Sequence, residues 1–337
     1  MVENPRKSFD SKDLMNLRRA FVVLAVAAFA ARAPGASSRT DEAVRLFDAR
    51  QFDRARPLLE TALREDPGDA RAASYLGRLL LASDELDAAI ESLEKSVFLE
   101  EGNAEYHLWL GRAYGQKAIR ASVLKQPALA RKVRKEFETA SRLDPDSLEA
   151  RFGLVEYYLR APGLLGGSLE KAREQAREIA RRDALQGHRA AGRLAEHEKR
   201  FDAALEEYRQ AAVEFPQRPE PSYWTGSLLE KRKDFGRAFD VYERLLETQP
   251  TEMVACYQIG RLAILSGQRL ERAEQCLKLY LRREPKPDEP SLAWAHYRLG
   301  SLYERKGDRD LARREYAEAL KLEPAHREAR AALKKIS

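Results

Sequence analysis

Glycine recurs along this chain at a nearly constant interval, and that interval limits the possible fold more than any other feature of the sequence. Gly77 and Gly111 are 34 residues apart, and Gly192, Gly226 and Gly260 follow one another at the same spacing. In five units an alanine comes twelve or thirteen residues after the glycine, and a proline ends most units. Three registers with one period of about 34 residues indicate a stack of similar two-element units rather than one globular core.

Each unit has the pattern of two amphipathic helices. Apolar or small residues at unit positions 4, 7, 8 and 11 share one helical face, and those at 20, 24 and 27 share the face of a second helix. In the unit 219–252 the second set is Ala238, Tyr242 and Leu245, and Pro250 ends the unit because proline cannot continue a helix. One such pair cannot bury both faces alone, so neighbouring units must stack.

The motif Leu-Gly-x-x-Tyr, followed by alanine, an aromatic residue, alanine and proline, resembles the tetratricopeptide repeat. The last unit matches it best, with Leu299, Gly300, Tyr303, Ala312, Tyr316, Ala319 and Pro324. The resemblance implies an all-α fold, a right-handed α-solenoid of about eight helix-turn-helix tetratricopeptide repeats over residues 37–326, and a polar capping helix over 327–337. The units begin near residues 36, 70, 104, 148, 185, 219, 253 and 293. Glu101-Gly102 in place of proline, Val155 in place of glycine, and insertions in units three, four and seven depart from the motif.

Residues 1–36 have the layout of an export signal. An uncharged apolar run, residues 20–31, follows Arg18 and Arg19 and precedes small residues, as in a secretory signal peptide. The run is shorter than the roughly 20 apolar residues that cross a bilayer, so we expect no stable membrane span. Met15 offers a later start, which would make the first 14 residues an over-extended beginning. In a bacterium this leader predicts a periplasmic or secreted protein, with a retained membrane anchor as the alternative.

Charge and cysteine content narrow the function only slightly. The net charge is +6, and half of this excess lies in residues 1–35, so the basic pI gives little support for a nucleic-acid partner. The two cysteines, Cys256 and Cys276, are too few for a disulfide framework or a zinc ribbon. They fall at unit positions 4 and 23, which we expect to face different directions, so we expect no bond between them.

Motifs that carry catalysis are missing from the sequence. It holds no phosphate-binding glycine loop, no His-Glu-x-x-His, no nucleophile elbow and no Cys-x-x-Cys. His107, His188 and His296 all fall at unit position 4, at the edge of the core, which favours packing over metal binding. We therefore expect a protein that is not an enzyme and has neither a cofactor nor a metal site.

The candidate binding residues lie on the first helix of each unit. Positions 2, 6, 9 and 13 point away from the core face, and the resemblance implies that this face lines a concave groove where protein partners bind. Aromatic and arginine side chains, which dominate binding hot spots, occupy these positions and the flanking position 5. The candidates are Arg78, Trp109, Arg112, Arg193, Tyr223, Trp224, Tyr257, Arg261, Trp294 and Tyr297. In the alternative interpretation the aromatics pack between neighbouring first helices and each arginine pairs with an adjacent unit.

A basic insertion distinguishes the third unit. The segment from Gly111 to Val133 is ten residues longer than the repeat requires, and residues 106–135 contain no acidic side chain. The basic side chains of the insertion are Lys117, Arg120, Lys125, Arg131, Lys132, Arg134 and Lys135. Ile119, Val123, Leu129 and Val133 keep a helical spacing that sets them apart from the basic residues, so we expect both helices of this unit to be lengthened. Unit four has an insertion at the same inter-helix turn, residues 161–168.

The sequence therefore predicts a non-catalytic protein-protein interaction scaffold, exported to the bacterial cell envelope, that binds a segment of a partner in the concave groove. The alternative is an intracellular or membrane-anchored adaptor that contacts an anionic partner, such as an anionic surface, through the basic insertion at 112–135.

Overall fold

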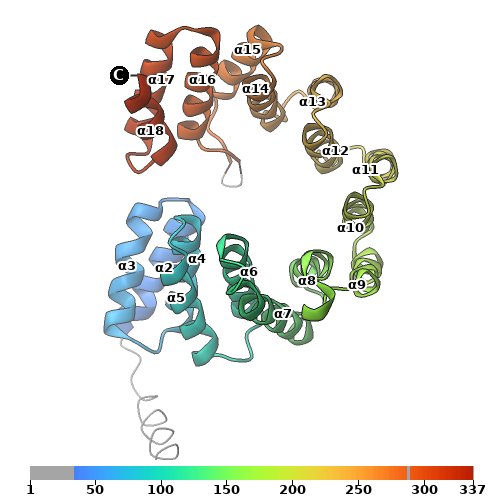
Figure 1. The fold of residues 1–337 in the computed structure, drawn as a ribbon. Helices are drawn as coiled ribbons and strands as arrows, with labels where there is room; N and C mark the ends of the chain where they lie inside the picture. The colour runs from blue at the N-terminus through green and yellow to red at the C-terminus, as the bar shows by residue number, and fades with distance from the viewer. Residues whose placement is uncertain (1–33, 287–288, 337) are drawn as a thin grey trace, which may run out of the picture. The chain divides into compact units, whose positions relative to one another are not determined.

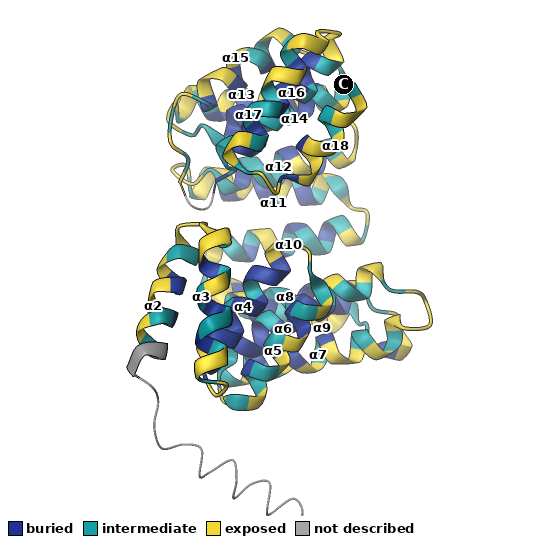
Figure 2. Ribbon diagram, turned by 90° about the vertical axis from the view of Figure 1, so that its left-hand side faces the viewer, coloured by how far each residue is buried: buried dark blue, intermediate teal, exposed yellow. Residues whose placement is uncertain are grey.

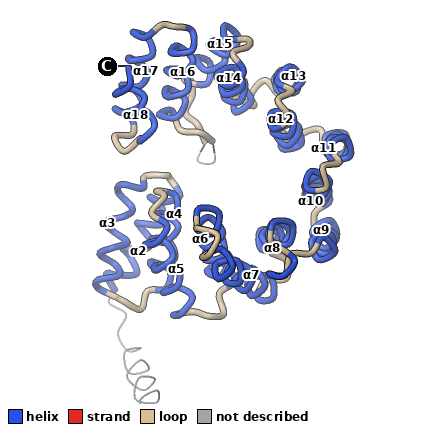
Figure 3. The backbone as a smooth tube through the Cα atoms, viewed as in Figure 1, coloured by secondary structure: helices blue, strands red, loops and turns tan. Residues whose placement is uncertain are grey.

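The computed structural model describes residues 34–286 and 289–336. Within these ranges the regular structure consists of 17 α-helices and one short 3-10 helix, and no strand occurs there (Figure 3). Residues 1–33, which hold nearly all of the predicted export signal, lie outside the described part of the chain. Among the described helices, none combines the length and the apolar composition that a membrane span requires.

The chain forms two compact units, Met1–Lys117 and Ala118–Ser337. The described helices of the first unit are α2 (Pro34–Asp48), α3 (Phe52–Glu65), α4 (Ala70–Ala82), α5 (Leu86–Leu99) and most of α6 (Ala104–Arg120) (Figure 1). Those of the second are the end of α6, α7 (Gln126–Leu143), α8 (Leu148–Arg160), η1 (Gly163–Leu165), α9 (Leu169–Arg182), α10 (Ala184–His197), α11 (Phe201–Glu214), α12 (Glu220–Lys231), α13 (Phe235–Thr248), α14 (Val254–Ser266), α15 (Leu270–Tyr280), α16 (Leu292–Lys306), α17 (Arg309–Leu322) and α18 (Arg327–Ile336). First and second helices alternate along the sequence, and α18 follows as the expected capping helix.

Capping side chains define where several first helices begin. The carboxylate of Asp69 accepts a hydrogen bond from the backbone N–H of Ala72, and the hydroxyl of Ser147 accepts one from Ala150. Such side chains satisfy backbone donors that have no partner within the helix. In these repeats the short polar segment that ends one repeat therefore also starts the first helix of the next.

The repeat glycines allow the two helices of a unit to touch. A Cβ atom on Gly226 would lie 2.4 Å from the ring of Tyr242, and one on Gly260 would lie 2.6 Å from Leu277. Tyr242 and Leu277 are both almost completely buried, so each second helix places a large side chain directly over the glycine of its first helix. Buried residues accordingly form a stripe along each helix, as Figure 2 shows, with exposed residues on the opposite side.

The basic insertion lengthens both of its helices, as the spacing predicted. Helix α6 has 17 residues and α7 has 18, against 13 and 14 in α4 and α5. The apolar residues of the insertion, however, do not share one buried face. Val133 is buried, whereas Ile119 is 70% and Val123 is 78% exposed, because the added turns extend beyond the layer of neighbouring helices.

Candidate protein-interaction site

In the first unit, three of the predicted binding residues contact one another. The guanidinium of Arg78 lies 4.5 Å from the ring centroid of Trp109 and 4.3 Å from that of Tyr75, and Arg112 lies 4.6 Å from Trp109. Arg78 also donates a 3.0 Å hydrogen bond to Glu105, which accepts a second one from the indole of Trp109 at 3.3 Å. With its side chain only 13% exposed, Arg78 joins α4 to α6 and offers little surface to a partner.

In the second unit, two predicted arginines also pair with the preceding first helix. Arg193 on α10 lies 2.8 Å from Glu156 on α8, and Arg261 on α14 donates a 2.6 Å hydrogen bond to Glu230 on α12. Burial disfavours the charged form of Glu156, but the charge and hydrogen bond of Arg193 outweigh it and lower the pKa of this carboxyl group. These contacts match the alternative interpretation of the sequence, in which the arginines join adjacent units.

Two of the predicted tyrosines are engaged inside the second unit. The hydroxyl of Tyr223 donates a 2.6 Å hydrogen bond to Glu252, and burial together with this carboxylate raises the pKa of Tyr223. Tyr257 is only 7% exposed, and its hydroxyl accepts a 3.3 Å hydrogen bond from Arg298. Both hydroxyl groups are therefore engaged within the protein, and we do not place a partner on them.

Trp294 and Tyr297 pack against the C-terminal cap. Their ring centroids lie 4.3 and 5.3 Å from that of His326, which is 2% exposed at the start of α18. His326 was not among the residues that the sequence pattern predicted for the site. The available signal was its place directly before the capping helix, where a polar side chain can accept a backbone N–H, as His326 does from Ala329 at 3.4 Å.

The remaining candidate, Trp224, belongs to a row of side chains on three successive first helices. Phe152 on α8, Arg189 on α10 and Trp224 on α12 form what we call the first-helix row. The guanidinium of Arg189 lies 4.7 Å from the ring centroid of Phe152 and 5.9 Å from that of Trp224. Arg189 is exposed and both rings are half-buried, so the row presents a cation between two aromatic faces at the surface.

A groove that the sequence analysis missed lies on the second helices. It has a volume of about 820 Å³ and is lined by α11, α12 and α13. Apolar side chains such as Leu205, Val241 and Leu245 line it together with polar residues. Ser222 and Thr225, which occupy core positions 4 and 7 of this unit, also reach it, and these small polar residues were the signal in the sequence. We call this feature the second-helix groove.

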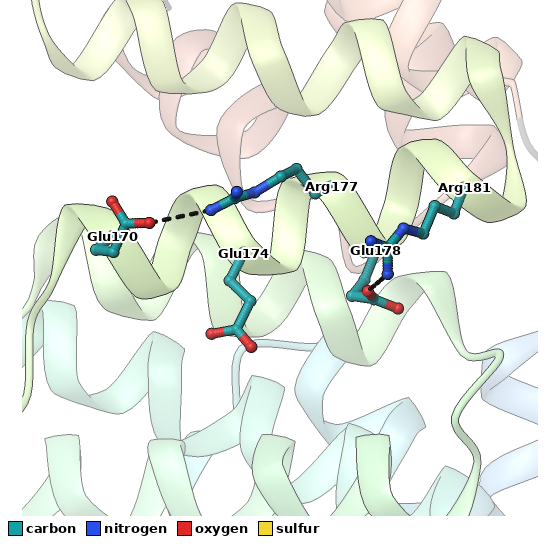
Figure 4. Close-up of a pocket in the computed structure, with 5 residues that line it drawn as sticks. All are labelled: Glu170, Glu174, Arg177, Glu178 and Arg181. Atoms are coloured by element: carbon teal, nitrogen blue, oxygen red, sulfur yellow. Dashed lines mark hydrogen bonds and ion pairs between the residues drawn. The ribbon is translucent and has the colours of Figure 1, made fainter.

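Another hollow, of about 340 Å³, lies along the outer face of α9 and is lined by Glu170, Glu174, Arg177, Glu178 and Arg181 (Figure 4). Arg177 lies 3.0 Å from Glu170, and Arg181 pairs with Glu178. All five residues come from one helix, and these ion pairs within it are of a kind common on exposed helix faces. This surface therefore shows no arrangement suited to catalysis.

In two repeats, a histidine at position 4 of the first helix faces the second helix of the same repeat. His188 lies 2.9 Å from Glu207, and His296 lies 2.7 Å from Glu315. These contacts agree with a structural role for the histidines. Among the described residues, no group of histidine, cysteine, aspartate and glutamate side chains is arranged to hold a metal ion.

In the repeat formed by α14 and α15, Cys256 occupies position 4 and faces Cys276 on the second helix. Their Sγ atoms are 3.0 Å apart, and the two side chains are 1% and 0% exposed. The expectation that Cys256 and Cys276 face different directions is therefore wrong. Position 23 lies next to position 24 on the second helix, and it shares enough of the inward face to meet position 4, as the histidine contacts also show.

The basic insertion keeps several of its charges unneutralised. Lys117 lies 2.5 Å from Asp87, whereas Arg134 and Lys135 have only distant carboxylates, at 3.8 and 3.9 Å. Lys125 and Arg131 are exposed and make no ion pair with any residue that the structure describes. Arg120 and Lys132 are exposed too, but they are not without partners.

Comparisons with known proteins agree with this architecture. Family models described as tetratricopeptide repeat match residues 46–114, 164–219 with 189–252, and 293–326, together more than half of the chain. The chain is 27% identical over 133 residues to the general transcriptional corepressor ssn6 of Schizosaccharomyces pombe, a match that covers 40% of this chain and 12% of that protein.

Solved structures of repeat proteins are also similar. A thermophilic tetratricopeptide protein of Thermus thermophilus has 21% identity and a TM-score of 0.48, covering 58% of this chain and 98% of its own. A tetratricopeptide protein of Parabacteroides merdae has 12% identity and a TM-score of 0.48, covering 90% of this chain and 99% of its own. The fold expected from the sequence is confirmed as an all-α helical-repeat solenoid. The chain belongs to the tetratricopeptide-repeat family, whose members are typically non-catalytic scaffolds for protein interaction.

Proposed function

We propose that this protein is an exported scaffold that holds a segment of a partner protein in a groove on its first helices, against the first-helix row. The observation that carries the proposal is the position of Arg189 between Phe152 and Trp224. Tryptophan and arginine are the residue types most enriched in binding hot spots, and here they lie together at the surface.

The charge of Arg189 remains available, unlike that of two neighbouring candidates, Arg193 and Arg261. Arg193 and Arg261 each pair with a glutamate of the preceding first helix. Among the residues that the structure describes, Arg189 forms no ion pair, and it donates only a 3.3 Å hydrogen bond to Gln186 on its own helix. A guanidinium between aromatic rings suits a carboxylate or a backbone carbonyl, so the partner segment is expected to bring an acidic side chain to this point.

The binding test compares two double variants in a crosslinking pull-down from cell-envelope extract. Trp224→Ala with Arg189→Ala should weaken partner capture by about 1–2 kcal/mol or more, which is the scale of hot-spot truncation. The control, Phe98→Ala with Arg64→Ala, removes an exposed aromatic residue and an exposed arginine from second helices, and it should capture the partner like the parent. Full capture by the first variant, with helicity unchanged by circular dichroism, would remove the row from the binding site.

Export is tested separately from binding. Cell fractionation and the mass of the mature N-terminus are the two measurements. We expect the protein in the envelope fraction, with an N-terminus near the end of the apolar leader. An intact leader on a cytosolic protein would contradict export and leave the binding proposal standing.

A further inference from the structure

The exposed apolar residues of this protein are not spread evenly over its surface. Among the described residues nine large hydrophobic side chains are exposed, and four of these lie on or beside two inter-helix turns. These are Ile119 at 70% in the last turn of α6, Val123 at 78% and Leu124 at 93% between α6 and α7, and Leu164 at 89% in η1. We call residues 119–131 together with Leu164 the insertion tip. Helix repeats do not require exposed leucines, so this concentration needs another explanation.

The two turns lie near each other. The 3-10 helix η1 contacts α7, and the guanidinium of Arg134 lies so close to Gly166 that a Cβ there would be 2.5 Å from its Nη1. The turns therefore form one end of the α7–α9 layer within the second unit.

The electrostatics of the insertion tip have a single sign. No acidic side chain occurs in residues 106–135, and residues 161–168 carry no charge. Lys125 directly follows the most exposed leucine, and Arg131 lies about one and a half turns further along. Both are exposed and form no ion pair within the described part of the chain.

We propose that the insertion tip is a docking site for an anionic phospholipid surface. Val123, Leu124 and Leu164 would enter the region of the headgroups and upper acyl chains, while Lys125 and Arg131 meet the lipid phosphates. Exposed apolar side chains beside basic ones are the combination that holds peripheral proteins at a membrane interface. An acidic protein surface would account for the charges, but it would not account for a leucine that is 93% exposed at the outermost turn. This inference is independent of the first-helix row, which involves other residues.

The first test removes charge and measures co-sedimentation of the full chain with vesicles of phosphatidylcholine, with and without phosphatidylglycerol. A basic residue near an anionic surface strengthens binding about fivefold, so Lys125→Gln with Arg131→Gln should weaken binding to the anionic vesicles about tenfold or more. The control, Arg244→Gln with Lys334→Gln, removes two other exposed charges and should bind like the parent. All variants keep the apolar N-terminal run, so its own membrane affinity is the same in each.

The second test removes apolar area. Val123→Ser with Leu124→Ser should also weaken vesicle binding about tenfold, and it should do so equally at about 0.1 M and about 1 M salt, because burial of apolar groups is not screened. The control, Leu265→Ser with Leu322→Ser, replaces two other exposed leucines and should have no effect. For the charge variant, in contrast, we expect the weakening of vesicle binding to disappear at about 1 M salt, because salt screens the attraction between charges.

Two results would overturn the proposal. Equal binding of the parent and both tip variants to anionic vesicles would show that the tip does not contact lipid. Weaker binding of the charge variant with unchanged binding of the apolar variant would indicate a purely electrostatic contact, as expected for an acidic protein or polymer. Neither result would affect the binding test on Trp224 and Arg189.

Discussion

Two neighbouring repeats in the second unit follow one helical register but fill their interiors differently. In α14, positions 4 and 7 are Cys256 and Ile259, which are 1% and 0% exposed. In α12 the same positions are Ser222 and Thr225, both half-buried and both lining the second-helix groove. The repeat pattern therefore determines where the helices run, whereas side-chain volume at two positions decides whether the space beside them is filled.

The largest expected difference in stability between variants of these two repeats involves Leu277. This side chain is fully buried and lies directly over Gly260, so Leu277→Ala would leave a cavity between α14 and α15. We expect the free energy of unfolding to fall by about 2–5 kcal/mol, measured by urea denaturation. In the other repeat Val241 is only half-buried and lines the second-helix groove, so Val241→Ala should cost less than about 1 kcal/mol.

An exposed leucine provides the control for this pair. Leu265 is 53% exposed on α14, and Leu265→Ala should change stability by no more than about 0.5 kcal/mol. Equal losses for Leu277→Ala and Val241→Ala would mean that the two repeats are filled equally well and that the comparison is wrong.

The second prediction concerns the stability of the repeat formed by α14 and α15, which contains the cysteine pair. The thiols of Cys256 and Cys276 are 3.0 Å apart and 20 residues apart in sequence, so an external disulfide can oxidise them to one S–S bond while it is itself reduced to two thiols. A crosslink closing a loop of this length stabilises a protein by about 3 kcal/mol. Protein refolded in an oxidising glutathione buffer should therefore lose two hydrogens by mass spectrometry and unfold at a higher temperature.

The matched control is the variant with both Cys256→Ser and Cys276→Ser, whose unfolding temperature should not respond to reductant. If the parent keeps two titratable thiols after oxidative refolding, the pair is a packing contact only. Because exported proteins meet oxidising conditions, formation of this bond would also fit the proposed compartment.

The fold could be predicted from the sequence because its signals are local and repeated. Glycine at position 8, a large residue such as Tyr242 opposite it and a proline at the end of the unit act within one helix pair, so a single sequence reveals them. The binding site was harder to predict, because contacts between neighbouring repeats determine where most candidate side chains lie. Whether Arg193 meets Glu156 or solvent depends on how two repeats stack, and the period alone does not give that geometry.

Two features were missed for different physical reasons. The cysteine contact was missed because position 23 was assigned to the wrong side of its helix, although it lies only one residue from a core position. The exposure of Ile119 and Val123 was missed because helical spacing shows which residues share a face, but not whether a neighbouring helix covers that face. A helix longer than its neighbours has such an uncovered end.

The smallest expected change in stability comes from adding apolar volume to the repeat of α12 and α13, beside the second-helix groove. Thr225 is half-buried, and its hydroxyl donates a 2.8 Å hydrogen bond to the carbonyl of Pro221 on its own helix. Thr225→Ile keeps the β-branch and extends apolar volume into the second-helix groove, where Leu229 and Leu245 also lie. We expect a gain of about 1 kcal/mol in unfolding free energy, since each added methylene that is buried contributes roughly 0.8 kcal/mol and the lost hydrogen bond offsets part of the gain. Thr251→Ile is the control, because Thr251 is exposed and does not line the second-helix groove. A loss of stability in Thr225→Ile, with Thr251→Ile neutral, would show that Thr225 is retained for its hydroxyl, so that the polar side chain and not the missing volume distinguishes α12 from α14.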